Sequence, residues 1–204
     1  MVKAMGGHAL YSVHDGAYVL KLTGDVRVPM CATLDRFIEG MFKDPSLKGV
    51  LIDLGDTEAI DSTALGLLAK IAIYYDRQFQ AKPLLLSPNH DITKILLSMG
   101  FPQVFDLRTG VQNVGTQGPA GSSPAKSAPL STPAPLSEVP SVGCSEQNAC
   151  DKVLEAHRIL MSMNDSNREA FKDVVQALEE VRQQKESDCD CAKAEQVVSR
   201  SLKP

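Results

Sequence analysis

The stretch that most constrains the fold is residues 50–68, which read VLIDLGDTEAIDSTALGLL. Its first five residues are apolar except for Asp53, and turn-forming residues follow them, which is typical of a β-strand covered on both faces. Asp61 and Ser62 each carry an oxygen that can cap the first amides of a helix. Apolar residues then recur at helical spacing. The stretch predicts a buried strand, a polar connector and a helix that opens at residues 61–63.

Ser62 is the candidate phosphorylation site. Its hydroxyl is expected to lie exposed where the strand turns into the helix, above free amides and the positive end of the helix dipole, a position that favours a phosphate. The alternative interpretation is that Ser62 only caps the helix and is never modified. The expected partner-binding surface here comprises Asp56, Glu58, Asp61, Ser62, Thr63 and Gly66.

The acidic residues of this stretch could instead form a cation site or an acid–base site, since α/β folds place ligands near strand ends. No catalytic His or Lys and no Gly-rich phosphate loop accompanies them. The five cysteines are expected to be reduced thiols. Cys189 and Cys191 stand too close in sequence for ordinary zinc spacing, and no second pair completes four ligands. We therefore predict no catalytic residue, no metal and no cofactor, and a protein that is not an enzyme.

The overall composition limits the classes of partner that the protein is expected to bind. The chain has 204 residues, 43% of them hydrophobic, and a formal net charge of −4 without a basic run. This argues against nucleic acid or an anionic membrane as the main partner. The first ten residues lack a signal-peptide pattern, and no apolar run approaches the roughly 20 residues that cross a bilayer. A cytoplasmic protein is expected.

The rest of the first half predicts a small mixed sheet with packed helices. Asp15-Gly16 between two alternating runs predicts a hairpin over residues 9–22, followed by a turn at 23–25. A helix is expected from Pro29, a strand at 84–86, a helix over 87–100 and a strand at 104–107. Strands that alternate with helices imply parallel neighbours joined by right-handed crossovers. The hairpin makes the α/β sheet mixed.

The second half changes character. Of residues 115–146, 19 are Pro, Gly, Ser or Thr, which predicts a disordered linker over 111–147. A helical hairpin is expected over 148–186, with a flexible tail at 187–204 and an N-terminal arm at 1–8. Ser166 and Glu169 have the spacing of a capping box that opens the second helix. The apolar faces should dock on the first domain, on a second copy or on a partner, with His157 as a packed ring.

Asp53-Leu54 followed by Asp61-Ser62-Thr63-Ala64-Leu65-Gly66 resembles the STAS domain of bacterial anti-sigma-factor antagonists over residues 9–110. The resemblance implies a STAS fold with an appended helical segment, since the segment that begins AHRILM is similar to C-terminal helices of some proteobacterial antagonists. It also implies that Ser62 is phosphorylated by a partner that is both anti-sigma factor and serine kinase. A metal-dependent serine phosphatase would remove the phosphate.

The function that this resemblance implies is an anti-sigma-factor antagonist, which binds its anti-sigma factor when Ser62 is unphosphorylated and releases it when phosphorylated. Such partner switching controls transcription indirectly. Two alternatives stay open: a STAS assembly subunit without phosphorylation, and a scaffold acting through its C-terminal helices. The scaffold would recruit a second signalling protein through the stripe Phe171, Val174, Val175 and Leu178.

Overall fold

The computed structural model describes residues 6–110, 135–141, 143 and 146–201. The first part of the predicted N-terminal arm and residues 111–134 of the predicted linker lie outside these ranges. The elements follow one another as β1 (His8–His14), β2 (Ala17–Val26), α1 (Val28–Phe42), β3 (Gly49–Ile60), α2 (Ser62–Phe79), β4 (Leu84–Leu86), α3 (His90–Ser98), β5 (Asp106–Arg108), β6 (Ser137–Glu138), α4 (Glu146–Met163) and α5 (Asp165–Ser201).

The predicted mixed sheet is confirmed. The strand order is β5-β4-β3-β2-β1-β6. Pairing is parallel from β2 through β5, whereas β1 runs antiparallel to both β2 and β6. Asp15 and Gly16 form the predicted hairpin turn, each with a positive φ (49° and 82°), as a two-residue turn between twisted strands requires.

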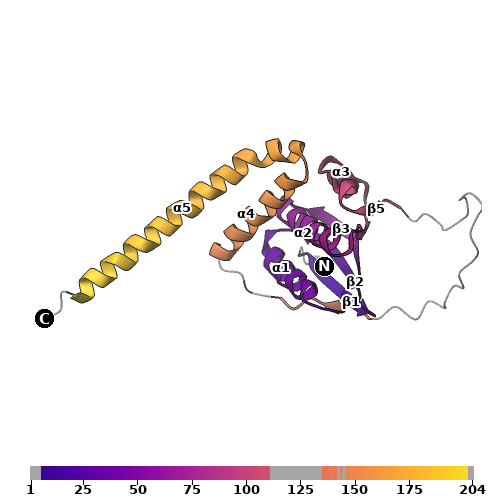
Figure 1. The fold of residues 1–204 in the computed structure, drawn as a ribbon, viewed down its shortest axis with the longest axis horizontal. Helices are drawn as coiled ribbons and strands as arrows, with labels where there is room; N and C mark the ends of the chain where they lie inside the picture. Colours follow the sequence, from indigo (N-terminus) through magenta and orange to yellow (C-terminus); the bar gives the residue numbers. More distant parts are fainter. Residues whose placement is uncertain (1–5, 111–134, 142, 144–145, 202–204) are drawn as a thin grey trace, which may run out of the picture.

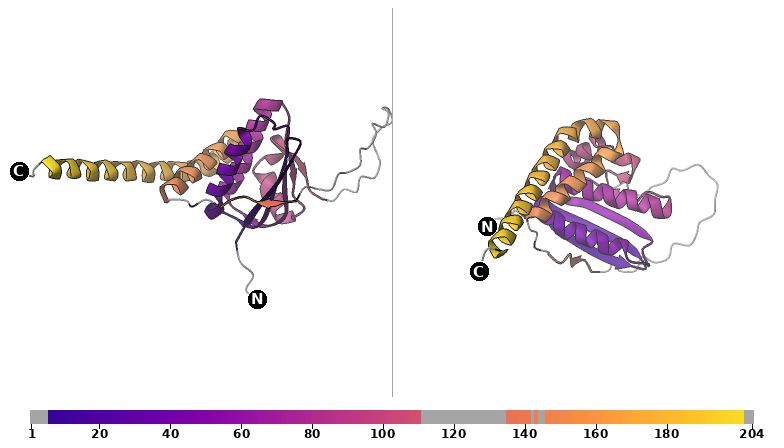
Figure 2. Two further views of the ribbon diagram at one scale, coloured as in Figure 1. Left: turned by 90° about the horizontal axis from the view of Figure 1, so that it is seen from below. Right: turned by 60° about the vertical axis from the view of Figure 1, so that its left-hand side comes forward.

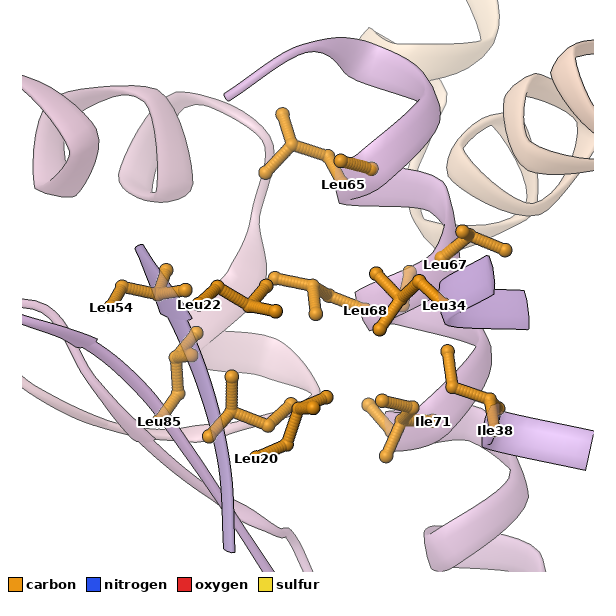
Figure 3. Packing of buried hydrophobic residues seen from close by; sticks show 14 of the residues in the cluster. Leu20, Leu22, Leu34, Ile38, Leu54, Leu65, Leu67, Leu68, Ile71 and Leu85 are labelled. Atoms are coloured by element: carbon orange, nitrogen blue, oxygen red, sulfur yellow. The ribbon is translucent and has the colours of Figure 1, made fainter. Parts of the chain in front are cut away.

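The core lies on one face of the sheet. Leu20, Leu22, Leu54 and Leu85 of the strands meet Leu34, Leu68 and Ile71 of α1 and α2, and all seven side chains are buried. Figure 3 shows the two sets facing one another across the core. The prediction that the central strand is covered on both faces is wrong, because Leu51 and Asp53 on its other face are only half-buried.

The central strand is also longer than predicted. The expected polar connector continues β3 to Ile60, and the expected turn at residues 23–25 continues β2 to Val26. These extensions pair with each other through two register shifts. Thr57 stabilises the irregular region, since its buried hydroxyl donates to the Leu22 carbonyl oxygen at 2.9 Å. Register shifts break the simple alternation that sequence reasoning relies on.

The remaining elements of the domain follow the prediction closely. Pro29 lies in the first turn of α1, Asn89 caps α3 with its side chain, and Gly100 takes the left-handed conformation just beyond that helix. The last strand begins at Asp106 instead of residue 104, because a 3-10 turn over residues 101–103 comes first.

Part of the predicted linker belongs to the sheet. Ser137 and Glu138 pair with Tyr11 and Leu10 of the edge strand β1, and the Val139 amide donates to the Ala9 carbonyl oxygen at 2.8 Å. Val139 is only 5% exposed and joins the hydrophobic core. The prediction of disorder is therefore wrong for residues 135–141, where an edge strand offers unpaired backbone groups to a chain that passes beside it.

The C-terminal helices form a hairpin that packs on the α/β domain. The helix α4 lies against α2 and α1, and α5 turns back alongside α4 before its C-terminal half projects from the body (Figures 1 and 2). Of the three predicted docking targets (the first domain, a second copy or a partner), the hairpin packs on the first domain. The helices extend beyond the expected hairpin, since α4 begins at Glu146 and α5 continues through the predicted tail to Ser201.

The cap of α5 also differs from the prediction. The Asn167 amide donates to Asn164 Oδ1 at 2.8 Å, so the side chain of Asn164 caps the helix. Ser166 lies inside the first turn of α5 and cannot serve as the cap of the predicted capping box. Asp165 starts the helix two residues earlier than that pattern implied, since a Ser166 cap would make residue 167 the first helical residue.

Candidate partner-binding and phosphorylation site

Asp61 fixes the start of α2 and of α1 together. Its Oδ1 accepts a hydrogen bond from the Ala64 amide and its Oδ2 accepts one from the Val28 amide, both at 2.8 Å. One carboxylate thus caps two helices at their positive ends, where a negative charge is most favourable. Ser62 follows as the first residue of α2, at the predicted place.

The hydroxyl of Ser62 is directed at α4. Ser62 Oγ lies 2.9 Å from Nε2 of His157, and Nδ1 of the same ring lies 2.7 Å from the Val153 carbonyl oxygen. A carbonyl oxygen only accepts, so Nδ1 carries a hydrogen, and in a neutral ring Nε2 is then the acceptor. In that form the Ser62 hydroxyl donates to Nε2 of His157.

The expectation of an exposed Ser62 hydroxyl is wrong, because α4 covers this end of α2 and leaves Ser62 half-buried. The His157 ring is 5% exposed and packs edge-on against Phe171, with ring centroids 5.2 Å apart. The sequence predicts His157 only as a packed ring. Its place on the apolar face of α4 was visible, but nothing local indicated which surface that face would cover.

The same contact continues along α2. Thr63 is 2% exposed, and the backbone of Gly66 lies directly against Ala156 of α4. Thr63 is therefore buried, and Gly66 is covered by the protein's own C-terminal hairpin.

An ion cluster holds α4 to both helices beneath it. Lys70 of α2 lies 2.7 Å from Asp35 of α1 and 2.8 Å from Glu155 of α4. Lys152 of α4 lies 2.5 Å from Asp35 and 3.3 Å from Glu155. The Asp35 side chain is only 3% exposed, so two cations compensate a nearly buried carboxylate. No sequence pattern predicts this cluster, since its residues become neighbours only in the fold.

Burial alone would lower the pKa of Lys70 and of Lys152. Hydrogen bonds and attraction to the nearby carboxylates outweigh burial, so both pKa values are raised from the ordinary lysine value. Both lysines stay charged, which keeps the cluster intact.

The turn of the hairpin is anchored at a second place. The side-chain amides of Asn164 and Asn167 donate to the Met99 carbonyl oxygen at the end of α3, at 3.3 and 3.0 Å. Asn167 is 2% exposed and also donates to the Leu160 carbonyl oxygen. The hairpin is thus fixed at its turn as well as along α4.

The structure separates Asp56 and Glu58 from Ser62. Asp56 lies 2.6 Å from Lys21 on the face of the sheet opposite to the helices, and the hydrogen bond to Asp56 raises the pKa of Lys21. Glu58 alternates with the buried Thr57 and shares that open face. Both carboxylates line a cleft of about 550 Å³ with Asp25 and Asn89. The predicted cluster of negative charge around Ser62 is therefore split between two faces.

Only part of the predicted apolar stripe on α5 is buried. Val175 is 7% exposed, whereas Val174 is 43% exposed. Phe171 and Leu178 are half-buried, with Phe171 in contact with His157. One side of the stripe serves the hairpin and the other faces outward.

Among the described residues, no group of three His, Cys, Asp or Glu side chains could hold a metal ion. Cys144 and the side chains of Cys189 and Cys191 lie outside the description. Within the same part of the chain, none of the helices combines the length and the apolar character that a membrane crossing needs.

Comparison with curated proteins gives no match. Among solved structures, the chain is similar to phosphorylated SpoIIAA of Bacillus, with 16% identity, coverage of 49% of this chain and 89% of that chain, and a TM-score of 0.42. The NMR structure of TM1081 has 18% identity, coverage of 50% and 80%, and a TM-score of 0.44. An anti-sigma factor antagonist from Mycobacterium paratuberculosis has 19% identity, coverage of 55% and 94%, and a TM-score of 0.46.

The model of the STAS domain family matches residues 9–114. The matched region begins in the hairpin β1–β2 and includes β3, the Asp61 cap and all of α2. Because the match spans more than half of the 204 residues, the chain belongs to the STAS domain family.

Proposed function

We propose that this chain is an anti-sigma-factor antagonist that binds an anti-sigma factor with serine kinase activity while Ser62 is bare, and releases it once Ser62 is phosphorylated. A serine phosphatase would restore the bare form, and the cycle would control transcription in the bacterial cytoplasm. The observation that carries the proposal is the position of Ser62 as the first residue of α2, next to the cap Asp61, within the matched STAS domain.

The charge change supports this polarity of binding. Phosphorylation adds about −1.5 to −2 charges at neutral pH. The start of α2 tolerates them, because the helix dipole favours an anion by about 0.3–1 kcal/mol. A partner surface shaped for a neutral hydroxyl would instead have to desolvate an unmatched dianion, which costs more than one contact returns. Binding in the bare state and release in the phosphorylated state follow.

The test compares Ser62→Ala and Ser62→Asp as bait in a pull-down from native lysate, followed by titration calorimetry with the anti-sigma factor that is captured. Ser62→Ala should bind constitutively and Ser62→Asp should bind weakly. Ser166→Asp is the matched control, because Ser166 is an exposed serine in the first turn of α5. Equal affinity of the two Ser62 variants would contradict the proposal.

A second candidate function is a scaffold that recruits another signalling protein through α5. Val174 and Val181 favour it, because they are 43% and 47% exposed and stand seven residues apart, about two helical turns, on one face of the helix. The double variant Val174→Glu/Val181→Glu should then lose a captured protein that Ser62→Asp retains. Capture unaffected by the double variant would rule out this surface.

A further inference from the structure

The contact between α4 and the start of α2 has a consequence for the regulation of Ser62. We propose that α4 is a built-in cap of this site: docked α4 and a phosphoryl group on Ser62 exclude each other, and His157 is the residue that distinguishes the two states of the serine. The inference rests on the proposed function, since it concerns the same modification of Ser62.

The space around the Ser62 hydroxyl is too small for a phosphoryl group. Only a hydrogen atom separates Ser62 Oγ from His157 Nε2, at 2.9 Å. Phosphorylation replaces that hydrogen with a phosphorus and three oxygens. The ring cannot turn aside without losing its hydrogen bond to Val153 and its packing on Phe171. A phosphoryl group in the present orientation of the hydroxyl therefore requires α4 to move.

The hydrogen bond between Ser62 and His157 also depends on the bare hydroxyl. Nε2 of the neutral ring accepts a hydrogen from the bare hydroxyl, but a phosphorylated Ser62 has no hydrogen on Oγ to donate. The acceptor would be left without its partner in a place where the ring is 5% exposed, and an unsatisfied buried polar group is unfavourable. Docking of α4 is therefore more favourable when Ser62 is unphosphorylated.

The helix α4 has no room to adjust locally. Gly66 and Ala156 bring the two helix backbones together one turn beyond Ser62, and the cluster of Asp35, Lys70 and Lys152 fixes the next turn. Well-packed interfaces of this kind change between discrete arrangements instead of deforming gradually. We expect α4 to leave as a unit.

The connection to the sheet keeps a released α4 close by. Val139 is buried at the sheet edge and α4 begins at Glu146, so the connecting chain spans at most about 25 Å. Such a short tether gives a high effective concentration, which allows re-docking after the phosphate is removed. By linkage, docked α4 disfavours the phosphorylated form of Ser62 by the same free energy by which the phosphate disfavours docking.

The test uses the full chain with phosphoserine incorporated genetically at position 62, and measures hydrogen exchange of α4 by mass spectrometry. A hairpin of this size has little core of its own, so released α4 loses protection. Exchange in α4 should accelerate by about 5- to 150-fold, the usual range for coupled sites. Phosphoserine at the exposed position 166 is the matched control and should leave α4 unchanged.

Two unphosphorylated variants define the released state. Ala156→Trp places a bulky ring against Gly66, with Ala170→Trp on the exposed side of α5 as its control. Lys152→Glu puts a carboxylate beside Asp35, with the exposed Lys172→Glu as its control. The first member of each pair should raise exchange in α4 and its control should not. The second pair preserves the test should the Trp variant fail to fold.

Unchanged α4 exchange with phosphoserine 62 would overturn the inference, including the case in which a protonated His157 pairs with the phosphate and holds α4 in place. Unchanged exchange in both Ala156→Trp and Lys152→Glu would overturn the docked interface itself. No partner protein is in the sample. The result is therefore independent of whether an anti-sigma factor distinguishes the two Ser62 variants, which tests the proposed function alone.

Discussion

Gly66 of α2 and Ala156 of α4 place two helix backbones in direct contact: a Cβ on Gly66 would lie 2.4 Å from the Ala156 carbonyl oxygen. No side chain larger than hydrogen fits there while α4 is docked. The glycine that the sequence suggested for an external partner instead accommodates the protein's own hairpin. An external partner that binds Ser62 and this face of α2 has to compete with α4 for the same surface.

Gly66→Ala should therefore weaken the docking of α4. The obstacle is backbone, which cannot turn aside like a flexible side chain, and overpacking of this kind costs about 1–3 kcal/mol. Gly40→Ala is the matched control, because it also lies inside a helix and nothing stands within 4 Å of its Cβ position. The control should stabilise the fold by about 0.5–1 kcal/mol through helix propensity.

Urea unfolding of both glycine variants, with hydrogen exchange of α4, would measure this difference. Gly66→Ala should lower the free energy of unfolding and raise exchange in α4, whereas Gly40→Ala should do neither. A Gly66→Ala variant as stable as Gly40→Ala would mean that α4 does not pack here in solution.

Asp35 supplies a second prediction about the hairpin. Its removal in Asp35→Ala leaves Lys70 and Lys152 close together with Glu155, and without the most buried carboxylate they share. Because the lysines are partly exposed, we expect a loss of about 1–3 kcal/mol in the free energy of unfolding. Replacing all three residues by apolar ones, in Asp35→Leu/Lys70→Met/Lys152→Met, should recover much of the loss.

Chemical denaturation of the single and triple variants checks this pair of outcomes. A triple variant less stable than Asp35→Ala would show that the ion cluster contributes net stability beyond compensating a buried charge.

The sequence carried enough information for the α/β domain, because its signals are local. The Asp15-Gly16 turn, the Asp61 cap and the apolar stripe of α2 each depend on neighbours within a few residues. The extension of β3 to Ile60 was missed because register shifts around Thr57 interrupt the alternation of buried and exposed residues.

The site itself could be predicted only in part. Ser62 stands where the pattern placed it, but its exposure depends on His157, which is 95 residues away in sequence. The strand at residues 137–138 was hidden by the Pro- and Ser-rich composition around it, since two paired residues and one buried valine leave no periodic signal. Contacts between distant segments leave no local pattern in the sequence, and for this reason they could not be predicted from it.

Thr57 provides a test of the irregular end of the sheet. Thr57→Val keeps the shape of the buried side chain and removes the hydroxyl that donates to the Leu22 carbonyl oxygen. The free energy of unfolding should fall by about 0.5–1.5 kcal/mol, the usual contribution of one such bond. The exposed Thr109→Val is the control and should be neutral. Equal stabilities in thermal melts of the two variants would contradict the role assigned to Thr57.

Tyr18 and Asp44 give the protein a pH dependence of known sign. The Tyr18 hydroxyl donates to Asp44 Oδ2 at 2.5 Å. Burial first, and then this bond and the negative charge of Asp44, raise the pKa of Tyr18 to about 12 from its ordinary value of 10.0. At a pH between 10 and about 12, unfolding therefore releases the Tyr18 proton. The contribution of Tyr18 to stability is complete below pH 10 and is lost as the pH rises toward 12.

The comparison of wild type with Tyr18→Phe isolates this contribution. Their difference in urea midpoint should be constant from neutral pH to pH 10 and should shrink as the pH approaches 12, with tyrosinate absorbance reporting the titration directly. Tyr75→Phe removes a hydroxyl that donates to the Lys48 carbonyl oxygen and serves as the control for loss of a tyrosine hydroxyl. At the acid end the same bond lowers the pKa of Asp44, so the Tyr18→Phe difference should also diminish once the pH falls low enough to protonate that carboxylate. A difference that stays constant across the whole range would show that Tyr18 and Asp44 are not bonded in solution.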